Sequence, residues 1–198
     1  QQAEALRIAL GAWANQSPRD AYAWAESHLS GPVKEEAIHS IVQRWATNAP
    51  EVAADWFVQT RSTSQPLLNT LAGAWGASNP KAAATWVETL ADAGNRQTGR
   101  VAIAREWAAQ NPSAAAGYFT PFLSEPAPPG FTTSPGLDLA TVLADIWGTT
   151  NPAGAAEWIG KLPAGPAREQ AAGTLATVWA ASDMEGAVAW SNTIADAS

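Results

Sequence analysis

Few side chains in this sequence could carry acid–base or metal chemistry. The two histidines, His28 and His39, have no metal-ligating partner at helical spacing in an arrangement that recurs along the chain. Glu35 and Glu36 stand at the start of a predicted helix, where negative charge complements the helix dipole. The sequence holds no cysteine, no Gly-rich phosphate loop and no nucleophile elbow. We therefore predict no catalytic, metal-binding or cofactor-binding residue, and we expect that the chain is not an enzyme.

Eleven tryptophans could instead stack on a ligand, but their spacing favours another role. One Trp, the repeat Trp, recurs after 32, 30, 32, 40 and 32 residues, and a second aromatic residue, the paired aromatic, follows eleven positions after each. Large aromatics at strict intervals beside small residues favour core packing over carbohydrate stacking. The predicted repeat core consists of Trp13, Trp24, Trp45, Trp56, Trp75, Trp86, Trp107, Tyr118, Trp147, Trp158, Trp179 and Trp190.

Each repeat Trp is followed by residues that predict the start of a helix. A proline stands five positions later in five units, Met184 stands there in the sixth, and an alanine always stands eight positions later. Proline fits a first helical position, and the Ser, Asn or Asp before it can cap the helix; Ala49 cannot, which predicts a weaker start there. We call this segment the Pro helix; it carries the alanine and the paired aromatic on one face.

The residues that lead up to each repeat Trp also predict a helix. Apolar residues three and four positions before the Trp indicate an amphipathic helix of about three turns, the Trp helix. A turn of about four residues then joins it to the Pro helix, so the two should pack antiparallel. Strand signals are absent. We predict an all-α, right-handed solenoid of six helical hairpins with a period of about 32 residues. It forms one domain, 1–198, with units ending near residues 30, 62, 94, 136, 166 and 198.

The spacing Pro18, Ala21, Trp24 and its counterparts resembles the junction between consecutive tetratricopeptide repeats. The period is close to that of this family, and the resemblance spans the whole chain. The family's Leu-Gly pair is missing, because Trp24 is followed by Ala25 and Glu26, and its later Tyr is missing too. The chain is therefore similar to tetratricopeptide-like or HEAT-like repeats without being a true tetratricopeptide member. The resemblance implies a protein-interaction scaffold.

Composition excludes several classes of function. The formal charge of −7 and the absence of a basic tract argue against nucleic-acid binding by phosphate neutralisation. The tryptophans and abundant aliphatic residues argue against disorder. No apolar run reaches the roughly 18 residues of a membrane span. Since cysteine is absent, lysines number only three and the loops are rich in Ser, Thr and Pro, we expect an exported protein, with a cytosolic one as the alternative.

The two ends of the sequence continue one another's repeat. The usual step from a paired aromatic to the next repeat Trp is 21 residues, and the 8 residues after Trp190 joined to the first 13 give the same step. This favours head-to-tail stacking of copies, in which a contact that does not close produces a filament. A closed (α/α)6 ring within one chain, a piece of a longer repeat array and an ordinary monomeric solenoid stay open as alternatives.

We accordingly predict a structural or interaction protein that assembles with itself. The alternative partner is another protein or a peptide, bound in the concave groove of a monomeric scaffold; a toroid that handles carbohydrate is a more distant third. A stacked assembly would use apolar side chains of the terminal helices. The predicted interface consists of Leu6, Leu10 and Trp13 against Val188, Trp190 and Ile194.

The fourth unit contains eight extra residues, which predict a loop over 124–136. Insertions in repeat proteins lie on one face, which is often the binding face. Phe131 either packs against the array or contacts a neighbour. Thr132, Thr133 and Ser134 resemble an O-glycosylation stretch in composition, although unmodified solvent-exposed residues explain them as well.

Overall fold

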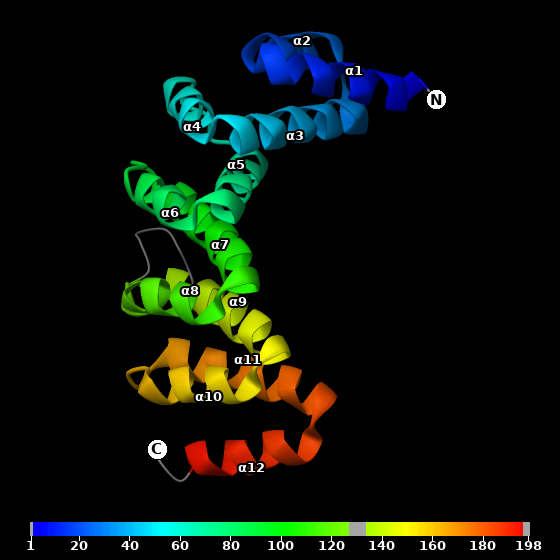
Figure 1. The fold of residues 1–198 in the computed structure, drawn as a ribbon. Coiled ribbons are helices and arrows are strands. Elements are labelled where there is room, and N and C mark those ends of the chain that lie inside the picture. The colour runs from blue at the N-terminus through cyan, green and yellow to red at the C-terminus, as the bar shows by residue number, and fades with distance from the viewer. Residues whose placement is uncertain (1, 127–133, 196–198) are drawn as a thin grey trace. The chain divides into compact units, whose positions relative to one another are not determined.

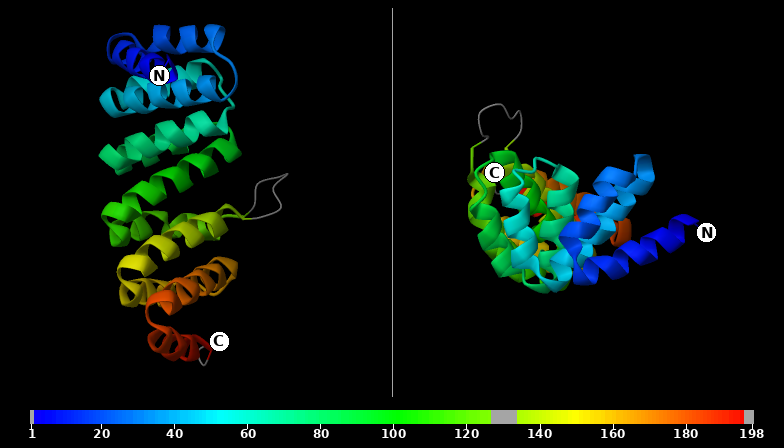
Figure 2. Two further views of the ribbon diagram at one scale, coloured as in Figure 1. Left: turned by 90° about the vertical axis from the view of Figure 1, so that its right-hand side faces the viewer. Right: turned by 90° about the horizontal axis from the view of Figure 1, so that it is seen from above.

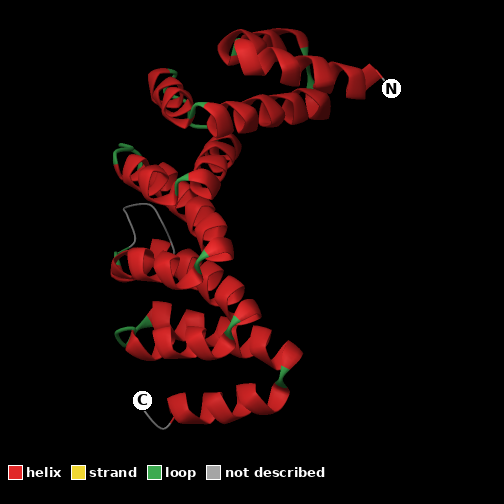
Figure 3. Cartoon of the chain, in the orientation of Figure 1, coloured by secondary structure: helices red, strands yellow, loops and turns green. Residues whose placement is uncertain are grey.

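The computed structural model describes residues 2–126 and 134–195 and contains twelve α-helices and one short 3-10 helix there (Figure 1). Those residues include no strand, so the prediction of an all-α chain is confirmed for them (Figure 3). The Trp helices are α1 (Gln2–Gln16), α3 (Gly31–Asn48), α5 (Gln65–Ser78), α7 (Ala93–Gln110), α9 (Pro135–Thr150) and α11 (Pro166–Ser182). The Pro helices are α2 (Pro18–His28), α4 (Pro50–Gln59), α6 (Pro80–Glu88), α8 (Pro112–Phe119), α10 (Pro152–Lys161) and α12 (Met184–Ala195).

The chain divides into two compact units, Gln1–Ile103 and Ala104–Ser198, with the boundary inside α7. In the first unit, α1 packs on α3 and α3 packs on α5, while each Pro helix packs on its neighbouring Trp helices. In the second unit, α9 lies beside α11, α10 packs on both of them, and α12 packs on α11 (Figures 1 and 2). Helices that are consecutive in sequence are therefore neighbours in space within each unit.

A single residue joins each Trp helix to its Pro helix, which corrects the prediction of a turn of about four residues. This joint residue uses both of its backbone groups. Its N–H donates to the carbonyl of the repeat Trp at 2.7–2.8 Å, and its carbonyl accepts the N–H of the repeat alanine at 3.0–3.1 Å. Its backbone is extended, with φ between −140° and −151°. The six joint residues are Ser17, Ala49, Asn79, Asn111, Asn151 and Asp183.

The following proline makes so short a joint possible in five units. Proline has no N–H to leave unpaired at the first helical position, and it disfavours helical geometry in the residue before it. The repeat alanine of each Pro helix lies one turn further on and is buried, at most 3% exposed in all six units. A side chain of minimal volume at this point lets the two helices approach closely.

The joint residues differ in how they cap the Pro helix. Asn111 and Asn151 each accept a backbone N–H on the side-chain oxygen at 3.0 Å, and Asp183 does the same. Ala49 cannot cap, as predicted from its side chain. Ser17 makes no side-chain cap either, so the prediction that Ser17 caps its helix is wrong. Its backbone bonds alone hold the joint in that unit.

Neighbouring Trp helices interlock through a small residue and a larger aliphatic one. At two junctions the glycine directly after a repeat Trp lies against the aliphatic residue four positions before the next repeat Trp. A Cβ added to Gly76 would lie 3.1 Å from the Ile103 Cα, and one added to Gly148 would lie 2.7 Å from Leu175 Cδ1. Ile103 and Leu175 are fully buried. Close approach of helix backbones therefore explains why only Ala or Gly follows the repeat Trp.

The repeat Trp and the paired aromatic of every unit lie against each other. Their ring centroids are 5.1–6.4 Å apart in all six units, which is the usual range for interacting aromatic side chains. Five of these pairs consist of two Trp rings, and the fourth unit pairs Trp107 with Tyr118. The antiparallel hairpin brings together two residues that the sequence separates by eleven positions.

The insertion of the fourth unit begins as a 3-10 helix, η1 (Thr120–Ser124), which packs on α9. The Trp158 indole N–H donates to Thr120 Oγ1 at 3.0 Å, and Ser134 Oγ donates to the Glu125 carbonyl at 2.8 Å. The second bond joins the two ends of the insertion. Ser134 therefore serves a structural role, while Phe131, Thr132 and Thr133 lie outside the described residues.

The cap difference predicts unequal effects of truncation. Asn111→Ala should lower the free energy of unfolding by about 1 kcal/mol, because the Ala114 N–H loses its acceptor. Ser17→Ala should change it by less than about 0.3 kcal/mol, because no cap bond is lost. Urea unfolding followed by circular dichroism measures both. Equal losses in the two variants would show that the capping bonds do not set the difference.

The sixth joint predicts a stabilising substitution. Met184 occupies the first position of α12, its side chain is 62% exposed, and Asp183 before it has the same extended backbone as the residues that precede proline. Met184→Pro should raise the free energy of unfolding by about 0.4–1 kcal/mol by restricting the unfolded chain. Thermal unfolding beside a Met184→Ala control measures the gain. A lower midpoint for the proline variant would mean that this joint differs from the other five.

Candidate interaction surfaces

The outer face of α1 exposes apolar side chains that have no covering helix among the described residues. Ile8 is 60% and Trp13 is 38% exposed, and Ala9 between them is exposed as well. Ala9 occupies the position four before the repeat Trp, where every later unit has a fully buried Leu or Ile. This face of α1 is thus the one that interior Trp helices bury against the preceding Trp helix.

Two residues of the predicted interface are already part of the first unit's core. Leu10 is only 4% exposed and belongs to the same cluster of buried side chains as Ile41 and Trp45, and Leu6 packs partly against that cluster. Leu10 therefore offers little surface to a second chain. Sequence periodicity did not separate the two sides of the helix, because the positions three and four before the repeat Trp are both small or apolar in every unit.

The last helix, α12, exposes a second apolar face. Met184 is 62% and Val188 is 52% exposed, and they lie one helical turn apart. Trp190 and Ile194 are half-buried, as is Ala180, the small residue after the last repeat Trp. In the interior units the residue at the position of Ala180 is buried against the next Trp helix.

One position of α12 departs from the interior units. The residue directly after the paired aromatic is Ser191 in α12, and it is exposed. The last helix therefore does not match the interior Pro helices at this position. The five counterparts are apolar and at most 2% exposed, namely Ala25, Phe57, Val87, Phe119 and Ile159.

Contacts between repeats within residues 1–103 show what such a face meets. Tyr22 stands at the position of Val188. Its ring packs edge-on against Trp56 of the next repeat, with the ring centroids 4.6 Å apart. Phe57 stands at the position of Ser191. Its ring centroid lies 6.3 Å from that of Trp86 in the next repeat. The face of a Pro helix that carries these two positions therefore receives the paired aromatic of the following hairpin.

The twelve predicted core aromatics are not equally covered. Trp45, Trp75 and Trp107 are at most 5% exposed, whereas Trp13 is 38% exposed. Incomplete cover is not confined to the first and last repeats. Half-buried aromatics are Trp24, Trp86, Tyr118, Trp147, Trp179 and Trp190.

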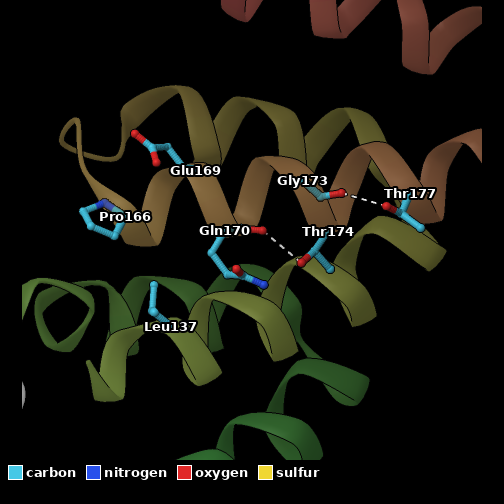
Figure 4. A pocket seen from close by; sticks show the side chains of 7 residues that line it. All are labelled: Leu137, Pro166, Glu169, Gln170, Gly173, Thr174 and Thr177. Atoms are coloured by element: carbon cyan, nitrogen blue, oxygen red, sulfur yellow. Dashed lines mark hydrogen bonds between the residues drawn. The ribbon is translucent and has the colours of Figure 1, made fainter. Parts of the chain in front are cut away.

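Two open grooves lie between adjacent Trp helices, one in each of the two compact units. The groove between α9 and α11 has a volume of about 510 Å³ (Figure 4). Its lining residues are Leu137, Pro166, Glu169, Gln170, Gly173, Thr174 and Thr177. The groove between α1 and α3 has a volume of about 360 Å³. Its lining residues are Asn15, Ser40, Gln43, Arg44, Thr47 and Asn48. Hydroxyl and amide side chains make up most of the lining of the second groove and three of the seven lining residues of the first, and they could hydrogen-bond a polar ligand.

The residues with acid–base potential do not converge. His28 stacks on Trp24 with ring centroids 4.8 Å apart, and His39 lies 2.9 Å from Thr70 Oγ1 on the next Trp helix. Within the described part of the chain, no three His, Asp or Glu side chains gather in a way that could hold a metal ion. Glu35 and Glu36 lie in the second turn of α3.

Comparisons of the chain with protein-family models, curated proteins and solved structures find no match. The resemblance to tetratricopeptide-like and HEAT-like repeats stays a prediction. Among the helices that the structure describes, none is both long enough and apolar enough to span a membrane.

Tyr22 links the packing of these faces to pH. Burial, the charge of Glu26 and a hydrogen bond to Glu26 together raise the pKa of Tyr22 to about 12, with burial the largest cause. The Tyr22 hydroxyl donates to Glu26 Oε1 at 3.2 Å. Between pH 10 and pH 12 the folded chain therefore keeps a proton that the unfolded chain has lost.

This predicts a loss of stability at high pH. The contribution of Tyr22 is fully present below pH 10 and disappears as the pH rises towards 12, since the unfolded state binds fewer protons in that window. Tyr22→Phe should flatten the decline of the unfolding free energy over this range. The absorbance change that the variant loses should be centred near pH 12. A lost absorbance change centred near pH 10 would contradict the raised pKa.

Proposed function

We propose that the chain is a non-catalytic helical-repeat protein that assembles head to tail, with the α12 face of one copy against the α1 and α2 face of the next. The observation that carries the proposal is the exposure of Ile8, Trp13 and Val188 on faces that interior units bury. Burying apolar surface drives association, and exposed apolar patches on repeat ends are otherwise a liability.

The interior junctions supply the contacts that such an assembly would repeat. Trp24 of the incoming copy would lie on Val188, as Trp56 lies on Tyr22 inside the first unit. Ala9 of the incoming copy would lie on Ala180, as Ile103 lies on Gly76.

The chemistry of these faces favours reversible association. Ala9 stands where the other repeats carry a larger residue, Leu or Ile. Ser191 stands where the other repeats carry a buried apolar residue. Less apolar area is therefore available than at an interior junction, which lowers the affinity. We accordingly expect assembly that depends on protein concentration in the absence of any other partner. An exported location would suit such a polymer.

Two single-face variants test the proposal. Ile8→Glu places a charge on the α1 face, and Val188→Glu places one on the α12 face; each should weaken association by at least about tenfold, since an unpaired charge would become buried. Val58→Glu is the matched control, because Val58 is also 52% exposed but lies on neither face. Light scattering after size exclusion, over a wide concentration range, measures the average mass.

A mixture of the two variants makes the test sharper. Each variant keeps one intact face, so Ile8→Glu and Val188→Glu together should form dimers and stop there, while each alone stays monomeric. Negative-stain images of the unmodified chain should show rods of uniform width. A monomer at every concentration, or a mixture that does not dimerise, would overturn head-to-tail assembly; compact closed rings would do so as well.

A further inference from the structure

We propose that the groove between α9 and α11 binds a cationic side chain, an arginine or lysine within an extended segment of a partner polypeptide. This inference is independent of self-assembly. It follows from the hydrogen-bonding capacity that the groove presents, from its charge, and from the open space above Gly173.

Donor hydrogens at the base of the groove are already used. Thr174 Oγ1 donates to the Gln170 carbonyl and Thr177 Oγ1 donates to the Gly173 carbonyl, each at 2.9 Å (Figure 4). Because a hydroxyl has one hydrogen, both oxygens retain only acceptor capacity. Gln170 Nε2 donates to Thr141 Oγ1 at 3.1 Å across the two helices. The lone pairs of Thr174, Thr177 and Gln170 therefore remain for a ligand that brings donors.

The negative charge at the groove also favours a cationic ligand. Glu169 is exposed at the edge of the groove and contributes a carboxylate. The nearest basic residue in sequence, Arg168, lines a different recess together with Leu162 and Pro163. The second unit as a whole carries nine Asp and Glu against three Arg and Lys. A cation entering the groove is thus attracted both locally and by the field of the unit.

An arginine covers a helical glycine between α1 and α3, at another place in the repeat: Gly11 stands two positions before its repeat Trp, whereas Gly173 stands six positions before its own. There Arg44 lies over Gly11, with its Nε 3.0 Å and its Cζ 3.2 Å from the place that a Gly11 Cβ would take. The guanidinium of α3 thus covers a helical glycine of α1 at the groove between the two helices. In the second unit Gly173 lines the groove, and nothing within 4 Å would meet an added Cβ. The space above Gly173 is open for a guanidinium from another chain.

Gly173 also has no packing role that explains it. It lies in the middle of α11, where glycine costs about 0.5–1 kcal/mol relative to alanine. Gly148, by comparison, faces Leu175 at close range. The missing side chain of Gly173 leaves the groove open, and we infer that this opening admits the stem of the ligand's side chain.

Peptide binding tests the proposal in the full chain. The probes are capped Gly/Ser peptides with one central Arg, Lys or citrulline, which keeps the shape of Arg but removes its charge. Changes in amide chemical shifts on peptide addition give the affinity. The NMR spectra are recorded on the Val188→Glu variant, so that a failure of self-assembly and a failure of peptide binding can be told apart. The Arg peptide should bind at least about tenfold more tightly than the citrulline peptide and should move the signals of residues 169–177.

Two variants fix the site without disturbing the fold. Gly173→Leu fills the groove and meets no neighbour, so it should abolish binding while leaving the unfolding midpoint unchanged or higher. Glu169→Gln should weaken binding by about tenfold, whereas Glu157→Gln, the same charge change at an exposed position of α10, should stay within about twofold. Equal affinity for Arg and citrulline, or binding that survives Gly173→Leu, would overturn the proposal. So would a free diamine that binds as tightly as the peptide.

Discussion

The rest of this structure depends on one residue between two helices. Six times, a single extended residue gives its N–H to the preceding helix and its carbonyl to the following one. Because both backbone groups are satisfied within the joint, no further loop is needed to pair them. The joint sets the angle between the helices, and the angle brings the repeat Trp to the aromatic eleven residues later. The core of each hairpin therefore follows from backbone hydrogen bonding at its joint.

The hairpins then join through differences in side-chain size. A glycine or alanine on one Trp helix accepts a leucine or isoleucine of the next, and an alanine on each Pro helix lies at the bottom of the hairpin. Such packing is directional, because the two sides of a hairpin carry different residues. A face left without a neighbour keeps the shape of a repeat junction. The exposed faces of α1 and α12 have this character, although Ala9 and Ser191 make them less apolar than an interior junction.

The sequence contains enough information to predict the helices but less to predict their contacts. Twelve helices follow from periodicity, and this prediction is confirmed in the described residues. The length of the joint could not be read, because a capping residue before proline is compatible with one turn residue or several. Ser17 has a side chain capable of capping, yet backbone bonds alone hold its joint.

The candidate surfaces show the same limit. Leu10 and Ala9 are neighbours in sequence, and only packing decides that Leu10 enters the core while Ala9 faces outwards. Ser191 could have been found from the sequence, since its five counterparts are apolar. The groove between α9 and α11 could not, because it depends on which threonine hydrogens are used within the helix.

The one-residue joint also determines where the chain can change in length. The Pro helix starts at the fifth position after the repeat Trp in every repeat. The step from a paired aromatic to the next repeat Trp varies and is 19, 21 or 29 residues. One residue added inside a joint would disrupt the two backbone hydrogen bonds of the joint residue and displace the paired aromatic from the repeat Trp. Insertions and deletions are therefore tolerated at one edge of each hairpin only. Foreign segments introduced at that edge, as in the fourth unit, leave the repeat in frame.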